Sequence, residues 1–147
     1  MSAITIGQLA ELSDVTTDTI RFYEKLKLLR PWQRTRSGYR LYDDSAVRRL
    51  TFIRKAKFLG FSLEEIKKLL ALNATNTASC DAMLKITNAK ILETRAKLQD
   101  LSRIRSILSR LAKDCPGGTK PISECPILEF LHSPKQRKPI SLKPRRR

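Results

Sequence analysis

One stretch of 35 residues constrains this chain more than any other. Between Cys80 and Asp114 the sequence contains neither proline nor glycine, which predicts one long helix. Apolar residues recur on it at intervals of seven, with threonines in the companion positions: Leu84, Ile91 and Leu98, then Leu101 and Leu108, with Thr87 and Thr94. These residues form a narrow apolar stripe along the helix, called the seam below. A helix of this length spans about 50 Å and cannot bury such a stripe within a small chain. We therefore expect a second copy to supply the partner helix.

The segment before this helix predicts a helix-turn-helix at about residues 5–27. Thr5 and Gln8 form a capping-box pattern, and Ser13-Asp14 marks the end of the first helix. A second helix is expected from Thr16 to about residue 27. Its residues Thr17, Arg21 and Lys25 share one polar face, which suits either the major groove of DNA or plain solvent exposure.

Residues 31–42 predict a β-hairpin, or wing, because Ser37-Gly38 marks a turn between two short β-prone runs. The hairpin carries Arg34, Arg36 and Arg40 beside aromatic residues, a composition that suits contacts with phosphates. Two further helices are expected at 45–59 and from Ser62 to about residue 72. Residues 1–72 are thus predicted to form a winged helix-turn-helix domain.

The rest of the chain divides into three further segments. Residues 73–114 are predicted to hold a linker and the long helix, which ends at Pro116-Gly117-Gly118. Residues 115–132 form a loop and a short helix that Pro126 opens. Residues 133–147 are expected to be a disordered basic tail, with seven basic and no acidic residues after position 134. Such a tail either aids solubility or binds DNA non-specifically.

The charge balance indicates a polyanionic partner. The chain has 30 Lys and Arg against 14 Asp and Glu, a net charge of +16. Such an excess suits nucleic acid or, less often, an anionic membrane. There is neither a secretory signal pattern nor an apolar run of about 18 residues, so we expect a cytoplasmic protein without a membrane partner. One histidine, with neither a phosphate-binding glycine loop nor a carboxylate pair, argues against an enzyme.

Three segments together resemble the MerR family of transcriptional regulators, in its heavy-metal-responsive branch. They are TIGQLAELSDVTTDTIRFYEK, SGYRLYDDSAVRRLTFIRKAKFLGFSLEEIKKLL and the terminal C-P-G…C-P-I-L-E, within residues 4–132. The resemblance implies a mainly α fold with a winged helix-turn-helix, a long antiparallel dimerisation helix and a short C-terminal metal-binding loop and helix. It also implies a homodimer that sits on promoter DNA, distorts it on binding an effector, and thereby activates transcription by RNA polymerase.

The resemblance assigns DNA-binding residues by position. Recognition-helix contacts would be Thr17, Arg21 and Tyr23, although Tyr23 is equally suited to the core. Wing contacts would be Arg34, Tyr39 and Arg40, and Arg54 would contact the DNA backbone from the third helix.

Three cysteines are the candidate metal ligands. Cys80 and Cys115 lie 35 residues apart, at opposite ends of the long helix, so they cannot bind one ion within a single chain. In an antiparallel pair, as in the family's dimer, Cys80 of one chain would meet Cys115 and Cys125 of the other. Two sites per dimer, each with three thiolates, would follow.

The donor set favours a divalent heavy-metal ion: mercury, lead or cadmium, with zinc as an alternative. Thiolates select soft ions, and the family's copper branch typically has serine at the position of Cys80. The zinc branch carries a cysteine doublet and a loop histidine, where this chain has Pro116 and Lys120. Zinc prefers four ligands, and His132 is expected two helical turns beyond Cys125. The Cys-Pro-Gly opening of the loop, however, resembles the copper branch, so a copper-responsive regulator is a further alternative.

Two other functions remain open from the sequence. The cysteines could serve a regulator that senses oxidants through its thiols without a metal. They could also be incidental in an architectural nucleic-acid-binding protein. Protection of the thiols by metal against alkylation separates the first from metal sensing, and loss of a metal response in Cys80→Ser excludes the second.

Overall fold

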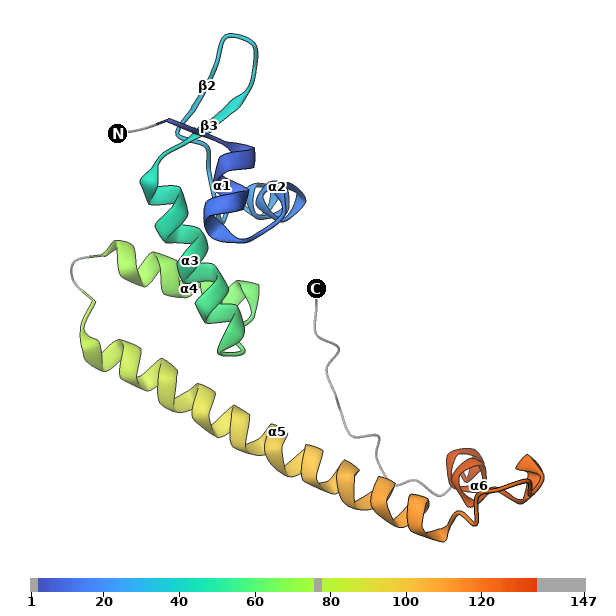
Figure 1. The fold of residues 1–147 in the computed structure, drawn as a ribbon. Helices are drawn as coiled ribbons and strands as arrows, with labels where there is room; N and C mark the ends of the chain where they lie inside the picture. Colours follow the sequence, from blue (N-terminus) through green and yellow to red (C-terminus); the bar gives the residue numbers. More distant parts are fainter. Residues whose placement is uncertain (1–2, 76–77, 135–147) are drawn as a thin grey trace. The chain divides into compact units, whose positions relative to one another are not determined.

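The computed structural model describes residues 3–75 and 78–134 (Figure 1). The predicted basic tail after position 134 therefore lies outside the described residues. The chain forms two compact units. The boundary between them in the sequence falls between Ala78 and Ser79, where Ala78 is four residues beyond the end of helix α4 (Leu63–Ala74). Each unit is described by itself below. Among the described residues, no helix is long and apolar enough to cross a membrane.

The first unit contains the expected helices and hairpin. In chain order these are α1 (Ile6–Ser13), α2 (Thr17–Lys25), strands β2 (Gln33–Arg34) and β3 (Arg40–Tyr42), α3 (Asp44–Phe58) and α4. Side-chain caps define the four helix starts: Thr5, Thr16, Asp43 and Ser62 each accept a hydrogen bond from a backbone amide of the first turn.

Two helix ends differ from the predictions. Helix α2 ends at Lys25 rather than near Lys27, because Lys27 adopts a left-handed conformation with φ of 59°. Helix α4 continues to Ala74 rather than Leu72. Its final turn, from Ala71 to Ala74, contains no glycine or proline that would stop it earlier.

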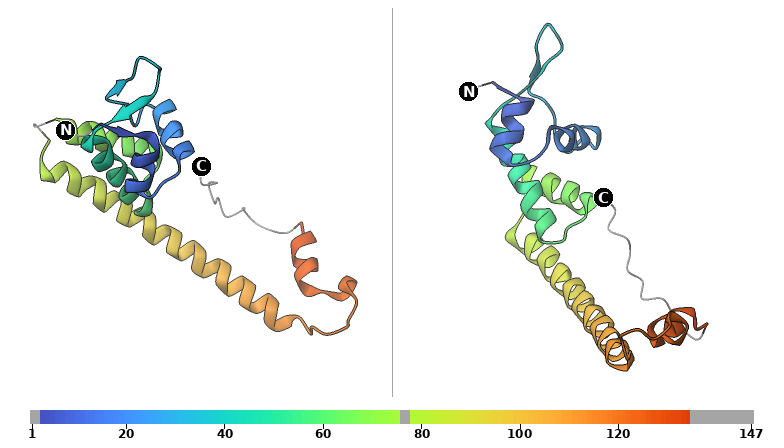
Figure 2. Two further views of the ribbon diagram at one scale, coloured as in Figure 1. Left: turned by 45° about the horizontal axis from the view of Figure 1, so that its top comes forward. Right: turned by 45° about the vertical axis from the view of Figure 1, so that its right-hand side comes forward.

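A two-residue strand, β1 (Ile4–Thr5), was not expected from the sequence. It pairs antiparallel with β3, with Ile4 opposite Tyr42, and gives a three-stranded sheet in the order β1-β3-β2. The β2–β3 hairpin projects from the helices of this unit in both further views (Figure 2). The small sheet thus anchors the base of the wing to the start of α1.

A single apolar core joins the helices of the first unit to the sheet. Fully buried side chains come from every helix and from β3: Leu9, Ile20, Tyr42, Leu50, Ile53 and Ile66. Helix α1 packs against both α2 and α3, so the turn between α1 and α2 is held from two sides. This packing presents α2 and the wing as a rigid pair.

The second unit consists of α5 (Cys80–Asp114), a short 3₁₀ helix at Ile122–Glu124 and α6 (Pro126–His132). The bounds of α5 match the predicted helix. Pro126 lies in the first turn of α6, as expected. Helix α6 and the 3₁₀ helix pack on each other, and α6 packs on α5.

Candidate functional site

On the polar face of α2, Thr17 is half-buried, whereas Arg21 and Lys25 lie open to solvent. Arg21 is exposed and forms an ion pair with Asp18 at 3.3 Å, and Lys25 is exposed four residues later. Tyr23 lies on the other side of the helix and is only 4% exposed, packed in the core with Ile20. The structure therefore supports the core interpretation of Tyr23, which the spacing of Ile20 and Tyr23 opposite the Arg21 face also indicates.

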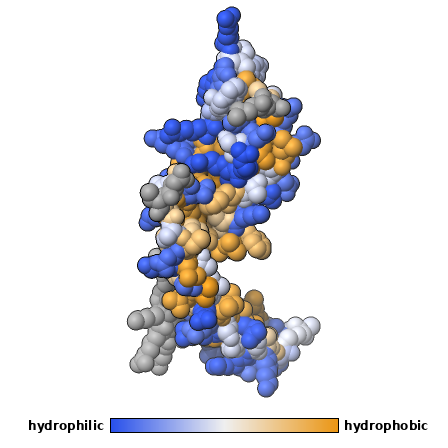
Figure 3. Space-filling model, turned by 90° about the vertical axis from the view of Figure 1, so that its left-hand side faces the viewer, coloured by the Kyte–Doolittle hydropathy of each residue, from blue (hydrophilic) through white to orange (hydrophobic). Residues whose placement is uncertain are grey.

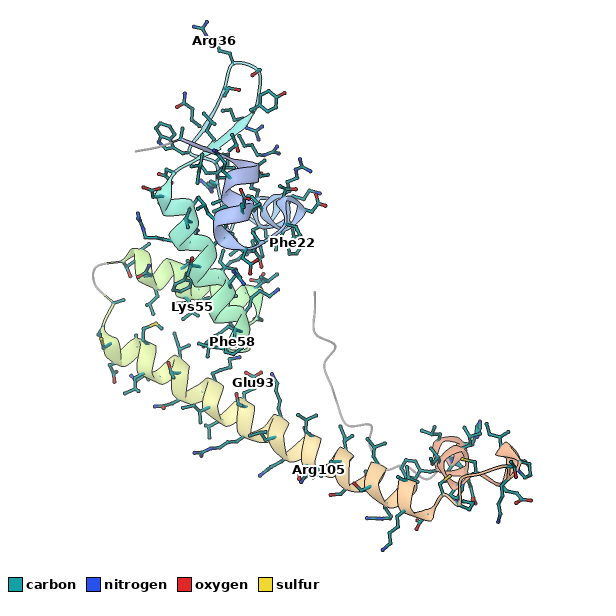
Figure 4. The ribbon with its side chains drawn as sticks, in the orientation of Figure 1. Phe22, Arg36, Lys55, Phe58, Glu93 and Arg105 are labelled. Atoms are coloured by element: carbon teal, nitrogen blue, oxygen red, sulfur yellow. The ribbon has the colours of Figure 1, made fainter. Side chains whose placement is uncertain are left out.

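Two of the three arginines of the wing, Arg34 and Arg36, are exposed, whereas Arg40 is half-buried. Arg36 lies at the hairpin tip and points away from the helices (Figure 4), and the tip is hydrophilic on the face shown in Figure 3. Gly38 has φ of 86°, a left-handed conformation that favours glycine, and this closes the tight turn. Tyr39, just after it, is 73% exposed. Such an exposed aromatic residue among arginines suits a nucleic-acid surface.

A groove of about 640 Å³ separates α2 from the wing. Its charged lining is mainly basic, with Arg21, Lys25, Arg30, Arg34 and Arg40 against Asp18 and Glu24. The side chains that the sequence places in two separate motifs thus share one concave surface. That surface can bind the polyanionic backbone of DNA through its positive charge.

Sequence reasoning missed a polar cluster at the base of this groove. Arg40 Nε donates to Glu24 Oε2 at 2.8 Å, and the hydroxyl of Tyr42 donates to the other oxygen, Oε1. Glu24 is on α2, whereas Arg40 and Tyr42 are on β3, so the cluster joins the helix to the wing. The sequence offered only a weak signal, a second acidic residue beside Arg21 and Lys25 on α2 in addition to Asp18.

Arg54, predicted to contact the DNA backbone, reaches from α3 to the turn between α1 and α2. Its guanidinium donates to the Ser13 carbonyl oxygen at 2.6 Å and pairs with Asp14 at 3.2 Å. Arg54 therefore has a structural partner on the helix-turn-helix itself. Its contact with DNA stays a prediction.

Two of the three cysteines come together in the second unit. Cys115 caps the C-terminal end of α5, and Cys125 precedes α6 at its N-terminus. The backbone amides of Leu128 and Ile127 lower the pKa of the Cys125 thiol, because they stabilise the thiolate. The Cys115 side chain lies near enough to that of Cys125 to contribute to the lowered pKa of the Cys125 thiol. The pair is thus a set of two soft donors, suited to a thiophilic metal ion.

Cys80 is exposed at the other end of α5, whose 35 residues correspond to about 50 Å. Within the part of one chain that the structure describes, no three His, Cys, Asp or Glu side chains cluster as a metal site. The Nδ1 atom of His132 lies 2.9 Å from the Leu128 carbonyl oxygen within α6. The cysteine pair therefore has no third protein ligand of these types in its own described chain.

Comparison with known proteins identifies the family. The MerR HTH family regulatory protein pattern matches residues 4–72, and the pattern described as MerR, DNA binding, matches residues 47–111. The mercuric resistance operon regulatory protein of Bacillus cereus is 44% identical over 126 residues, covering 86% of this chain and 95% of that protein. The chain belongs to the MerR family. It is a metal-responsive transcriptional regulator of that family and not an enzyme.

Other MerR-family relatives cover the chain equally well. The regulator ZntR of Escherichia coli K12 is 39% identical over 86% of this chain and 90% of its own length. The crystal structure of PbrR691 from Ralstonia metallidurans CH34, in complex with lead(II), is 32% identical, with a TM-score of 0.74. The match covers 87% of this chain and 98% of the PbrR691 chain. The winged helix-turn-helix fold expected from the sequence is thereby confirmed.

Proposed function

We propose that this MerR-family regulator activates a metal-resistance promoter when a divalent heavy-metal ion binds three cysteines of a homodimer. Cys115 and Cys125 of one chain supply two thiolates, and Cys80 of the second chain supplies the third. The observation that carries this proposal is the contact between the Cys115 and Cys125 side chains, with Cys80 exposed at the opposite end of α5. An antiparallel partner helix brings those two ends together.

The exposed seam of α5 supports the homodimer. Its five seam residues are 44–61% exposed in the single chain: Leu84, Ile91, Leu98, Leu101 and Leu108. Apolar side chains repeated at seven-residue spacing pack best against a second helix with the same repeat. The second copy of this chain offers such a helix, and a two-fold pairing makes both metal sites equivalent.

The donor set supports mercury, lead or cadmium as the effector. Thiolates prefer soft ions, and three of them without a fourth ligand suit these ions better than tetrahedral zinc. The names of two relatives refer to mercuric resistance and to a lead(II) complex, in agreement with this class of ion. Zinc is the second candidate because ZntR is 39% identical.

The metal acts through the conformation of the dimer. A site at the dimer seam is remote from the centre of the promoter, so it acts only by favouring one dimer conformation over another. The favoured conformation bends and untwists the DNA, which costs several kcal/mol in order of magnitude. The family resemblance implies that the regulator occupies promoter DNA with or without metal. The metal should therefore change transcription by RNA polymerase more than it changes DNA affinity.

In vitro transcription from the regulated promoter tests the proposal. Mercury, lead, cadmium, zinc and copper(I) are added in turn, and we expect activation by the first three. Cys80→Ser should keep its affinity for the promoter and lose the metal response, whereas Ser79→Ala, the adjacent control, should keep both. A full metal response in Cys80→Ser would contradict the three-thiolate site. Activation by hydrogen peroxide in metal-free solution would instead identify an oxidant sensor.

A further inference from the structure

A carboxylate lies at the base of the mainly basic groove between α2 and the wing. The Glu24 side chain is only 12% exposed, although it lines the groove between α2 and the wing. Burying a charge is costly unless it is paired, and Glu24 has two partners on β3. A negative charge in this place opposes DNA binding by simple electrostatics, so its position calls for a physical reason.

The bond between Arg40 and Glu24 determines how the guanidinium is turned. Guanidinium donors lie in one rigid plane, so fixing Nε at 2.8 Å from Glu24 Oε2 fixes the direction of the two terminal nitrogens. These terminal nitrogens are the donors that bind a phosphate in a bidentate manner. Arg40 lines the groove with its side chain one-third exposed, so it is accessible to a ligand there.

Tyr42 holds the carboxylate itself in place. Its ring is fully buried in the core, and its hydroxyl donates to Glu24 Oε1. Burial raises the pKa of Tyr42, and the bond to Glu24 raises it further, so the hydroxyl remains a donor at neutral pH. The core thus positions Tyr42, Tyr42 positions Glu24, and Glu24 positions Arg40.

We propose that Glu24 is a positioning residue for DNA binding, which holds the Arg40 guanidinium so that its terminal nitrogens meet a backbone phosphate. This inference rests on the proposal that Arg40 contacts DNA. Glu24 also ties α2 to the wing, so the base-reading helix and the phosphate-binding hairpin keep a constant spacing. The contribution of Glu24 to affinity passes through Arg40.

The direction in which one substitution changes the affinity for DNA distinguishes this role from a purely electrostatic effect of Glu24. Glu24→Gln removes a negative charge from the groove, and charge alone predicts tighter DNA binding. The neutral amide has one oxygen for two donors. Turned towards Tyr42, it presents its NH₂ group to Arg40, and turned towards Arg40, it offers only an uncharged acceptor, so the guanidinium is held less firmly in either orientation. Positioning predicts binding that is about fivefold to tenfold weaker, with a salt slope smaller by about one.

The experiment measures binding of the full chain to a random-sequence DNA duplex over a range of salt concentrations. Asp18→Asn is the matched control, because it removes one negative charge from the same groove at an exposed side chain, and it should not weaken binding. Arg40→Ala should lose about as much affinity as Glu24→Gln. The double variant should bind no more weakly than Arg40→Ala alone.

The outcomes distinguish the inference from the contact on which it rests. If Arg40→Ala binds like the wild type, the Arg40 contact and the positioning role both fail. If Arg40→Ala weakens binding while Glu24→Gln tightens it, only the positioning role fails. Arg40→Lys is a second variant that keeps the charge but lacks the guanidinium fork, and it should bind as weakly as Glu24→Gln. Wild-type affinity in Arg40→Lys would overturn the positioning role even if Glu24→Gln does not fold.

Discussion

The Arg54 guanidinium on α3 donates a hydrogen bond to the Ser13 carbonyl oxygen at the end of α1, across 41 positions of sequence. The same guanidinium pairs with Asp14, whose φ of 51° makes the left-handed turn between α1 and α2. Arg54 thus fixes the angle at which α2 leaves α1. A residue predicted from the family resemblance to contact DNA also stabilises the element that reads DNA.

Arg54→Ala should lower the free energy of unfolding by about 1–2 kcal/mol, because it removes a charged donor from a partly buried carbonyl. Urea unfolding of the full chain at constant protein concentration measures this change. Asp14→Asn is the control, since it removes only an exposed ion pair and should cost less than about 0.5 kcal/mol. Equal losses in the two variants would show that the Ser13 bond contributes nothing measurable.

Arg21 and Arg34 should differ in what they recognise. Arg21→Ala on α2 should cost about 1–3 kcal/mol on the true operator and much less on random DNA, as expected for a base contact. Arg34→Ala on the wing should weaken binding to the operator and binding to random DNA by the same factor. It should also reduce the salt slope of binding by about one. Titrations of each variant with both DNAs provide the comparison. Uniform losses for Arg21→Ala would assign it to the backbone instead.

The α5 seam should control the oligomeric state. Leu98→Lys/Leu101→Lys places two charges in the centre of the predicted interface, so the chain should become monomeric. Analytical ultracentrifugation measures the mass. Leu12→Lys changes a residue of similar exposure in the first unit and should leave the dimer intact. A dimeric double variant would mean that α5 does not form the interface.

Cys125 should ionise at a lower pH than an ordinary thiol. The amides of Leu128 and Ile127 lower its pKa, so the thiolate that reacts with iodoacetamide persists to lower pH. In Cys80→Ser/Cys115→Ser, the alkylation rate of Cys125 should reach half its maximum at a lower pH than it does in the unfolded chain. The same variant in urea should return to the ordinary midpoint, because unfolding removes both amide donors. Identical midpoints would exclude this effect of the helix terminus.

Local signals explain which parts of the fold were predictable. Thr5, Thr16 and Ser62 are caps whose partners lie three residues away, so the sequence alone reveals the start of each helix. The proline- and glycine-free run likewise predicts α5. Strand β1 escaped prediction because it exists only through its pairing with β3, nearly forty residues later.

The candidate site likewise contains residues that local sequence signals suggest and contacts that depend on the folded chain. Residue type and spacing were sufficient to propose Arg21 and the three cysteines as candidates, and the family resemblance added Tyr39. Their binding roles stay predictions. The contacts of Glu24 were not predictable, because its partners lie 16 and 18 positions away on a strand whose register depends on the whole sheet. The contact between Cys115 and Cys125 depends likewise on the path of the intervening loop.

Mixed dimers test the cross-chain metal site most directly. A Cys80→Ser chain is combined with a Cys115→Ser/Cys125→Ser chain, and metal binding is measured for the heterodimer and both homodimers. In the heterodimer, one site pairs the intact Cys80 of the second chain with the intact Cys115 and Cys125 of the first, while the other site has no thiolates. We expect tight binding to return at one metal ion per heterodimer, with neither homodimer binding as tightly. Binding no tighter than in the two homodimers would contradict this expectation, because the cysteines would then not meet across the seam.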